Sequence, residues 1–239
     1  MDKFWKWLNN ARDPDDEDGE RTMYLDGTIA EDSWFDDDIT PALFKEELFN
    51  GTGPITIYIN SPGGDCIAAS RIYTMLMDYP GKVTVKIDGI AASAASVIAM
   101  AGTEVLMAPT GLIMIHNPAT IAFGDHKEMA KTIEMLDEVK ESIINAYEIK
   151  TGLPRTKISD LMESETWMNA KKAIELGFAD GMLEDEKKSP KDEEAYSFSS
   201  KTAEHLLINR ITEKTKPVMP EKHGRSVDEL MERLSLLKN

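Results

Sequence analysis

The chain has 239 residues, 41% of them hydrophobic and 29% charged, which suffices for one substantial domain with an appendage or for two small domains. Its formal net charge of −16 argues against nucleic acid or an anionic membrane as the main partner, because both repel an acidic protein. Its single cysteine, Cys66, excludes an internal disulfide and a multi-cysteine metal site.

Residues 1–20 form an aromatic-basic segment followed by an acidic linker, DPDDEDGE. The spacing of the aromatic and aliphatic residues predicts one face of a short helix, made by Phe4, Trp5, Trp7 and Leu8. This segment is either a docking element or a strap folded back on its own domain. It contains no apolar run of signal-peptide length. The least polar stretch, residues 89–102, is shorter than a membrane span, so we expect a soluble, cytoplasmic protein.

From residue 21 the sequence alternates between β-rich runs and helical patterns. Strands are predicted at residues 23–25, 55–59, 83–87, 105–107 and 112–115. Helices are predicted at residues 40–49, 65–78, 94–101 and 126–150, the last with Gly152 just past its end. Apolar residues at steps of three or four predict one stripe along this long helix: Met129, Ile133, Leu136, Val139, Ile143 and Tyr147. Strand–helix–strand units with buried strands require right-handed crossovers, so we expect an α/β fold with a mainly parallel sheet.

The composition changes after residue 184 to a charged, serine-containing linker. Two modest helical patterns follow, at 203–211 and 227–237, and neither has the area for an independent core. We therefore divide the chain into the segment 1–20, a main domain at 21–184 and an appendage at 185–239.

Two adjacent glycines, Gly63 and Gly64, lie between a predicted strand and a predicted helix. They let backbone N–H groups point outward and form an anion-binding concavity, although a tight strand-to-helix turn would use the same residues. The segment is too short for a dinucleotide fingerprint or a P-loop, so we expect no nucleotide there.

Ser93 lies in the segment GIAASAAS, which again follows a strand and opens a helix. A hydroxyl at a helix N-terminus can lie where free N–H groups favour a developing oxyanion. The alternative is an ordinary N-cap. The small residues around Ser93 keep bulk away from it, as a site that admits a peptide backbone would require.

His116 ends an apolar strand in the segment MIHNPA. Open α/β folds place their sites at the carboxyl ends of strands, although a single histidine there can also be structural. Together the three segments would supply an anion cradle, a nucleophile and a base, which are the parts needed for serine acyl transfer.

The ordered motifs INSPGG, GIAASAAS, MIHNPA and TWMNAKKAIELGFAD resemble ClpP, the proteolytic subunit of the Clp proteases, over residues 21–183. The resemblance implies the ClpP/crotonase fold and a serine endopeptidase that hydrolyses extended polypeptides without a metal or other cofactor. It implies that Ser93 is the nucleophile and His116 the base. The implied oxyanion hole consists of the backbone N–H groups of Gly64 and Ala94.

The polypeptide substrate is expected to lie beside Gly63 and Gly64, with Asn117 and Pro118 as further contacts. The third member of the implied triad is Glu165, where ClpP usually has aspartate. Glutamate can stabilise an imidazolium, but it is one methylene longer, so its backbone must lie further back. The alternatives for this role are Asp160 and Asp125, and Glu165 could also be a solvated loop carboxylate.

The resemblance also implies a homo-oligomeric chamber of heptameric rings that stack in pairs through a handle formed by the segment after His116 and the long helix. The segments GIAASAASVIAMAG and TWM are most similar to ClpP-like proteases of phages and prophages, which are associated with capsid (head) maturation. The expected partners are therefore a Clp-type ATPase or phage capsid proteins, in the host cytoplasm if the protein is phage-encoded.

Other functions remain open at this level. One is a catalytically degenerate ClpP-like shell or scaffold protein. Another is a crotonase-like acyl-CoA enzyme, which shares the backbone oxyanion cradle but needs acidic catalytic residues and a basic patch for the CoA phosphates. A Ser–Lys signal-peptide peptidase would need a membrane segment, which the sequence does not predict.

Overall fold

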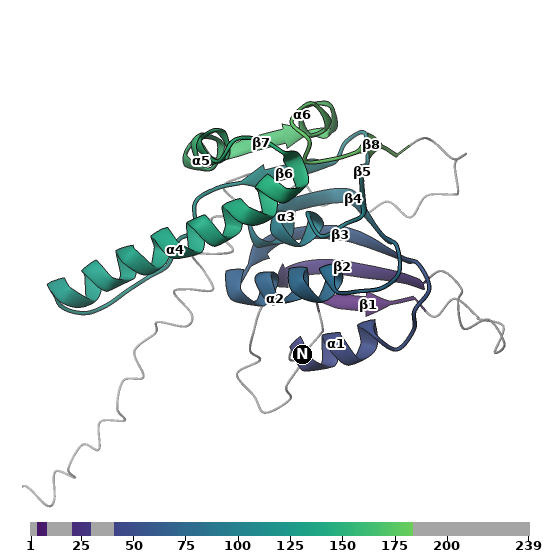
Figure 1. Cartoon of the computed structure of the whole chain (residues 1–239), viewed down its shortest axis with the longest axis horizontal. Helices are drawn as coiled ribbons and strands as arrows, with labels where there is room; N and C mark the ends of the chain where they lie inside the picture. The colour runs from purple at the N-terminus through teal and green to yellow at the C-terminus, as the bar shows by residue number, and fades with distance from the viewer. Residues whose placement is uncertain (1–3, 9–20, 30–40, 184–239) are drawn as a thin grey trace, which may run out of the picture. The chain divides into compact units, whose positions relative to one another are not determined.

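The computed structural model describes residues 4–8, 21–29 and 41–183. All of them belong to the first of two compact units, Met1–Asp192. The acidic linker and the two helices predicted at 203–211 and 227–237 lie outside the described residues. Within the described part, strands and helices alternate along the chain, so the predicted α/β class is confirmed (Figure 1).

The strands are β1 (Trp5–Trp7), β2 (Arg21–Ile29), β3 (Ile55–Gly64), β4 (Val83–Ala92), β5 (Glu104–Met107), β6 (Leu112–Ile115), β7 (Thr166–Asn169) and β8 (Gly181–Met182). The helices are α1 (Pro41–Leu48), α2 (Cys66–Met77), α3 (Ala94–Ala99), α4 (His126–Thr151), α5 (Arg155–Glu163) and α6 (Ala170–Glu175).

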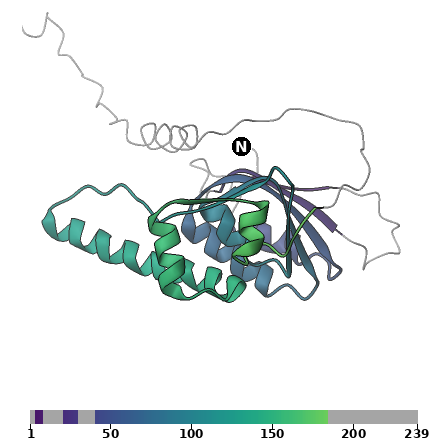
Figure 2. The same cartoon turned by 90° about the horizontal axis from the view of Figure 1, so that it is seen from above.

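The strands form one sheet in the order β1-β2-β3-β4-β5-β8, and β6 pairs with β4 and β7. Only β1 and β7 pair antiparallel among these strands; the rest are parallel, as expected of strand–helix–strand units. Helices α1, α2 and α3 lie on the same face of the sheet (Figures 1 and 2). Their apolar side chains pack on alternate strand residues such as Ile57, Val85 and Ile87, which are fully buried.

Strand β4 has different neighbours along its two halves. Its first half, Thr84–Ile87, pairs with β5, and its last three residues, Ile90–Ala92, pair with β6. This division brings the end of β6 beside the end of β4. The carboxyl ends of both strands therefore meet at one edge of the sheet.

Strands β3 and β4 are longer than the sequence predicts. Both continue through residues that disfavour strands, β3 as far as Gly64 and β4 as far as Ala92. Pairing of Ser61 with Ala91 and of Gly64 with Ile29 holds these extensions in the sheet. The tight turn considered for the two glycines is therefore the end of a strand, and α2 begins only after Asp65 caps it.

The helix predicted for the aromatic segment is wrong. Residues Trp5–Trp7 form β1, which pairs antiparallel with β2 at the edge of the sheet. The burial of these residues alternates as in a strand: Trp5 is 2% exposed and packs edge-on against Phe44, whereas Lys6 is exposed. The segment is thus folded back on its own domain, as the strap alternative expected.

Helix α4 has 26 residues and is about 39 Å long. A capping box at Asp125 and Glu128 starts it, and Gly152 ends it in the left-handed conformation with φ of 68°. Only its last third is buried in the domain, at Ile143, Ile144, Ala146 and Tyr147. The rest projects away from the sheet (Figure 1), so the apolar stripe predicted along the whole helix is buried only at its carboxyl end.

Candidate active site

Ser93 is the residue between the end of β4 and the start of α3, and its backbone is strained. Its φ of 54° and ψ of −125° lie in a region that costs an L-residue about 1–3 kcal/mol. Two backbone hydrogen bonds hold this conformation: the N–H of Ser93 donates to Met114 O (2.9 Å), and its C=O accepts from Ser96 N (2.9 Å).

The Ser93 hydroxyl makes no capping hydrogen bond, although the residue occupies the N-cap position of α3. Its Oγ instead lies 2.7 Å from Nε2 of His116. His116 directly follows β6, and the pairing of β6 with the last residues of β4 brings the two side chains together. The structure therefore juxtaposes the two residues that the sequence proposed as nucleophile and base.

Burial lowers the pKa of His116, and the negative charge of Glu165 partly opposes this shift. A histidine with a lowered pKa is neutral at pH 7. A neutral imidazole whose Nε2 accepts from the serine carries its proton on Nδ1. The His116 ring is thus in the protonation state that can remove a proton from Ser93.

Glu165 directly precedes β7, and His116 directly follows β6. Ile115 pairs with Thr166 at this end of the antiparallel ladder, so both residues lie just beyond its last pair. Within the described residues no hydrogen bond joins the carboxylate to the imidazole. One carboxylate oxygen, Oε1, accepts from the indole N–H of Trp167 at 3.0 Å. The backbone of Glu165 is in the left-handed region, with φ of 44°.

The two alternative acids have other surroundings. The carboxylate of Asp125 caps α4 by accepting from the N–H groups of Lys127 and Glu128. Asp160 belongs to α5, where its carbonyl accepts from Ser164. Glu165 is the acid whose charge acts on the pKa of His116.

Gly63 lies against the backbone around Ser93, and Gly64 lies against the backbone of Ile29. A Cβ at Gly63 would lie 2.6 Å from Ala92 O and 2.7 Å from Ser93 Cβ, and the φ of Gly63 is 96°. A Cβ at Gly64 would overlap the carbonyl of Ile29. Only glycine allows the end of β3 to approach the serine this closely.

Asn117, which follows the histidine, is tied to α5. Its Nδ2 donates to Glu163 at 2.7 Å, and this bond together with Lys140 lowers the pKa of Glu163. Its Oδ1 is buried and has no partner among the described residues. Pro118 follows it, partly buried. The substrate contacts predicted for these two residues remain a prediction.

Three polar residues near the site were not identified from the sequence. Ser96 and Tyr147 form a hydrogen-bonded chain behind Ser93, and Trp167 binds Glu165. The sequence placed Tyr147 in the apolar stripe of the long helix, where nothing distinguishes a tyrosine that packs from one that donates a hydrogen bond. Ser96 lies in the motif GIAASAAS. Only its spacing of three residues from Ser93 could have indicated that its hydroxyl reaches the Ser93 carbonyl.

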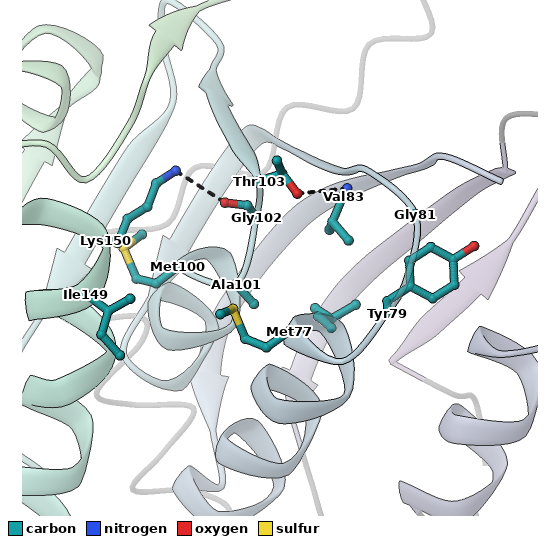
Figure 3. A pocket seen from close by; sticks show the side chains of 11 residues that line it. Met77, Tyr79, Gly81, Val83, Met100, Ala101, Gly102, Thr103, Ile149 and Lys150 are labelled. Atoms are coloured by element: carbon teal, nitrogen blue, oxygen red, sulfur yellow. Dashed lines mark hydrogen bonds between the residues drawn. The ribbon is translucent and has the colours of Figure 1, made fainter. Parts of the chain in front are cut away.

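A groove of about 320 Å³ lies elsewhere in the domain (Figure 3). It is lined by Gly81 and Val83 at the start of β4 and by Met77, Ile149 and Lys150 from two helices. Ser93 follows the opposite end of β4, so this groove is separate from the serine and histidine. The described residues contain no group of three or more His, Cys, Asp or Glu side chains placed to hold a metal ion.

A family model described as Clp protease matches residues 18–186. The chain belongs to the Clp protease family. Among curated proteins, the ATP-dependent Clp protease proteolytic subunit of Sorghum bicolor is 33% identical over 165 residues, which cover 67% of this chain and 75% of the relative. The ATP-dependent Clp protease proteolytic subunit 2 of Thermobifida fusca (strain YX) is 32% identical over 131 residues, covering 54% and 64%.

Membership of the Clp protease family confirms the resemblance to ClpP stated from the four motifs. The matched region contains the serine, the histidine, the glutamate and both glycines. No helix within the described ranges is long and apolar enough to cross a membrane.

Proposed function

We propose that this member of the Clp protease family is a serine endopeptidase with Ser93 as nucleophile, His116 as base and Glu165 as the supporting acid. The observation that carries the proposal is the 2.7 Å separation between Ser93 Oγ and His116 Nε2 at a strained strand-to-helix junction. A serine is a poor nucleophile until a neighbouring imidazole takes its proton. The lowered pKa of His116 keeps that imidazole neutral and ready to do so.

In acylation, Ser93 Oγ attacks the peptide carbonyl carbon while its proton passes to His116 Nε2. The carbonyl π electrons move to the oxygen, which the N–H groups of Gly64 and Ala94 stabilise. When the tetrahedral intermediate collapses, the C–N bond breaks and His116 gives the proton to the leaving amine. Water then repeats the sequence in reverse and releases the carboxylic acid and free Ser93.

An extended substrate is expected to pair with the edge formed by Gly63 and Gly64, since glycine backbone without side chains leaves its hydrogen-bonding groups accessible. The scissile carbonyl would then lie over Ser93. Asn117 and Pro118 would border the substrate on the histidine side. Glu165 would hold the His116 ring by its charge.

We further propose that the domain at 21–184 assembles into heptameric rings that stack in pairs and enclose the active sites. The projecting part of α4 and the segment before it expose four large apolar side chains, which favour burial against another copy: Ile121, Phe123, Ile133 and Met135. The names of the relatives describe those proteins as subunits of an ATP-dependent protease. A Clp-type ATPase or phage capsid proteins are the partners proposed for this chain, in the cytoplasm of the cell that contains it.

The test combines a fluorophosphonate probe, peptide hydrolysis and native mass spectrometry on the full chain. Wild type should hydrolyse a fluorogenic peptide, take up one probe per subunit and have the mass of stacked rings. Ser93→Ala should lose both hydrolysis and labelling while keeping the mass of the assembly. Hydrolysis by a well-folded Ser93→Ala variant would refute the assignment of the nucleophile. An assembled wild type without turnover would favour a catalytically inactive shell.

A further inference from the structure

A buried chain of hydrogen bonds runs from helix α4 to the carbonyl group of Ser93. Ser96 Oγ donates to Ser93 O at 2.6 Å, and the hydroxyls of Ser96 and Tyr147 are 2.8 Å apart. Ser96 is fully buried and Tyr147 is 1% exposed. Neither hydroxyl can exchange its partner for water, so the chain is a fixed part of the domain.

The direction of each hydrogen bond follows from donor counting. A carbonyl oxygen only accepts, so the single hydroxyl hydrogen of Ser96 goes to Ser93 O. The hydrogen between Ser96 and Tyr147 must therefore come from the Tyr147 phenol. Burial raises the pKa of Tyr147 well above its ordinary value, so the phenol remains a donor across the pH range of an assay.

The carbonyl that receives this chain belongs to the same planar peptide unit as the N–H of Ala94. A rotation of that plane about its ends turns the C=O and the N–H together. The Ser93 carbonyl is held by two donors, the backbone N–H and the hydroxyl of Ser96. The C=O and the N–H lie in this plane on opposite sides of the line between the two Cα atoms. Holding the carbonyl in place therefore fixes the direction of the Ala94 N–H.

We infer that Ser96 and Tyr147 are positioning residues that hold the strained Ser93–Ala94 peptide and aim its N–H group at the oxyanion. This inference rests on the proposed serine peptidase function and deepens it. The two residues touch neither the substrate nor the reacting atoms. They act through the peptide plane, and hydrogen bonds to its carbonyl also polarise the amide and strengthen its N–H as a donor.

The inferred role predicts a loss that falls on the transition state rather than on substrate binding. Removal of a whole oxyanion donor costs roughly 10²–10³-fold in rate, and a misaimed donor should lose part of this. We expect Ser96→Ala to lower kcat by about tenfold and Tyr147→Phe by about threefold, with KM changed less than twofold. Ser96 still donates to the carbonyl in Tyr147→Phe, which explains the smaller loss.

The matched control is Tyr73→Phe, which removes the same hydroxyl from a tyrosine in α2. The Tyr73 hydroxyl is buried and makes no hydrogen bond to any described residue. Its removal should leave kcat unchanged. All rates are expressed per active site, counted by titration with the fluorophosphonate probe on the full-length protein, so that a smaller folded fraction does not count as a lower kcat.

A peptide boronate gives a second measurement, because its tetrahedral adduct places an oxygen at the oxyanion position. The affinity of Ser96→Ala for the boronate should fall by the same factor as kcat/KM, whereas its affinity for a product peptide should not change. A purely structural role for Ser96 would leave the ratio of the two affinities at the wild-type value.

The double variant Ser96→Ala/Tyr147→Phe separates stability from catalysis. Ser96→Ala leaves the Tyr147 hydroxyl buried without an acceptor, so the melting temperature of this variant should be lower than that of the wild type. Removing the Tyr147 hydroxyl as well should restore part of the lost melting temperature. The double variant should keep the kcat of Ser96→Ala, because Tyr147 acts only through Ser96. Recovery of kcat together with the melting temperature, or wild-type kcat in Ser96→Ala, would overturn the inference. A wild type without turnover would overturn the proposed function and the inference together.

Discussion

The indole N–H of Trp167 donates a 3.0 Å hydrogen bond to Oε1 of Glu165, the carboxylate two residues before it. A glutamate has one more rotatable bond than an aspartate, so it needs more restraint to face a histidine in a single orientation. The bond to Trp167 occupies one carboxylate oxygen and restrains the side chain. In the proposed triad, this restraint offsets the greater freedom of the longer acid.

Trp167→Phe tests this relationship, because it keeps an aromatic ring and removes the donor. We expect kcat to fall about threefold to tenfold, the effect of one net hydrogen bond of about 0.5–1.5 kcal/mol. The measurement is kcat per titrated site with a fluorogenic peptide. The same substitution in a Glu165→Gln background should cause no further loss, and an equal loss there would show that Trp167 acts independently of Glu165.

The pH dependence of kcat/KM tests the state of His116. Only the neutral imidazole accepts the serine proton, so activity is present above the His116 pKa and is lost as the pH falls through it. Since burial lowers this pKa, the acid limb should lie below the ordinary histidine value of about 6.5.

Glu165→Gln should move that acid limb to still lower pH, because it removes the negative charge that raises the pKa of His116. At the same time kcat should fall by roughly 10²–10⁴-fold, since the imidazolium loses its counter-charge. The pH–rate profile of both proteins provides the measurement. An acid limb that stays at the wild-type pH would assign the supporting charge to another residue.

Gly63→Ala should abolish peptide hydrolysis and fluorophosphonate labelling. The new Cβ would lie 2.6 Å from Ala92 O and 2.7 Å from Ser93 Cβ, so the serine must move. The matched control is Gly152→Ala, where φ is also positive at 68° but no atom lies within 4 Å of the new Cβ. That variant should be destabilised by about 1–2 kcal/mol and still be labelled. Labelling of Gly63→Ala at the wild-type rate would contradict the close packing.

Trp5→Ala should lower the free energy of unfolding by about 3–5 kcal/mol, because the side chain is 2% exposed and packs on Phe44. Lys6→Ala, in the same strand but exposed, should change it by less than about 0.5 kcal/mol. Chemical denaturation monitored by circular dichroism measures both. Equal stability of the two variants would mean that β1 does not contribute to the core.

The sequence predicted the strands and helices from β2 to α4 in their order, because apolar periodicity is a local property. It predicted none of the short elements that follow, which are α5, β7, α6 and β8. It missed the last residues of β3, since Gly63 and Gly64 look like a turn and only their pairing with Thr28 and Ile29 of β2 keeps them in the sheet. It missed the last residues of β4, which pair with β3 and β6. It assigned a helix to Trp5–Trp7 because four residues are too few to separate the two periods.

Within the site, the serine and histidine could be found because each ends a strand in a recognisable motif. The meeting of Glu165 and His116 at one end of the β6–β7 ladder could not be derived from local pattern, since it depends on the antiparallel pairing of β6 with β7. The roles of Ser96 and Tyr147 depend on a contact between residues 51 positions apart, which composition and spacing do not reveal.

Because β4 pairs first with β5 and then with β6, the number of residues in the short connection at 108–111 sets the register of β6 on β4. Its two ends are fixed, because Ala108 N–H donates to Ile87 O and Leu112 pairs with Ile90 on the same strand. One additional residue there would leave every core contact of β5 intact but would shift β6 by one position. Since strand residues alternate between faces, that shift would turn the imidazole of His116 to the opposite side of the sheet from Ser93.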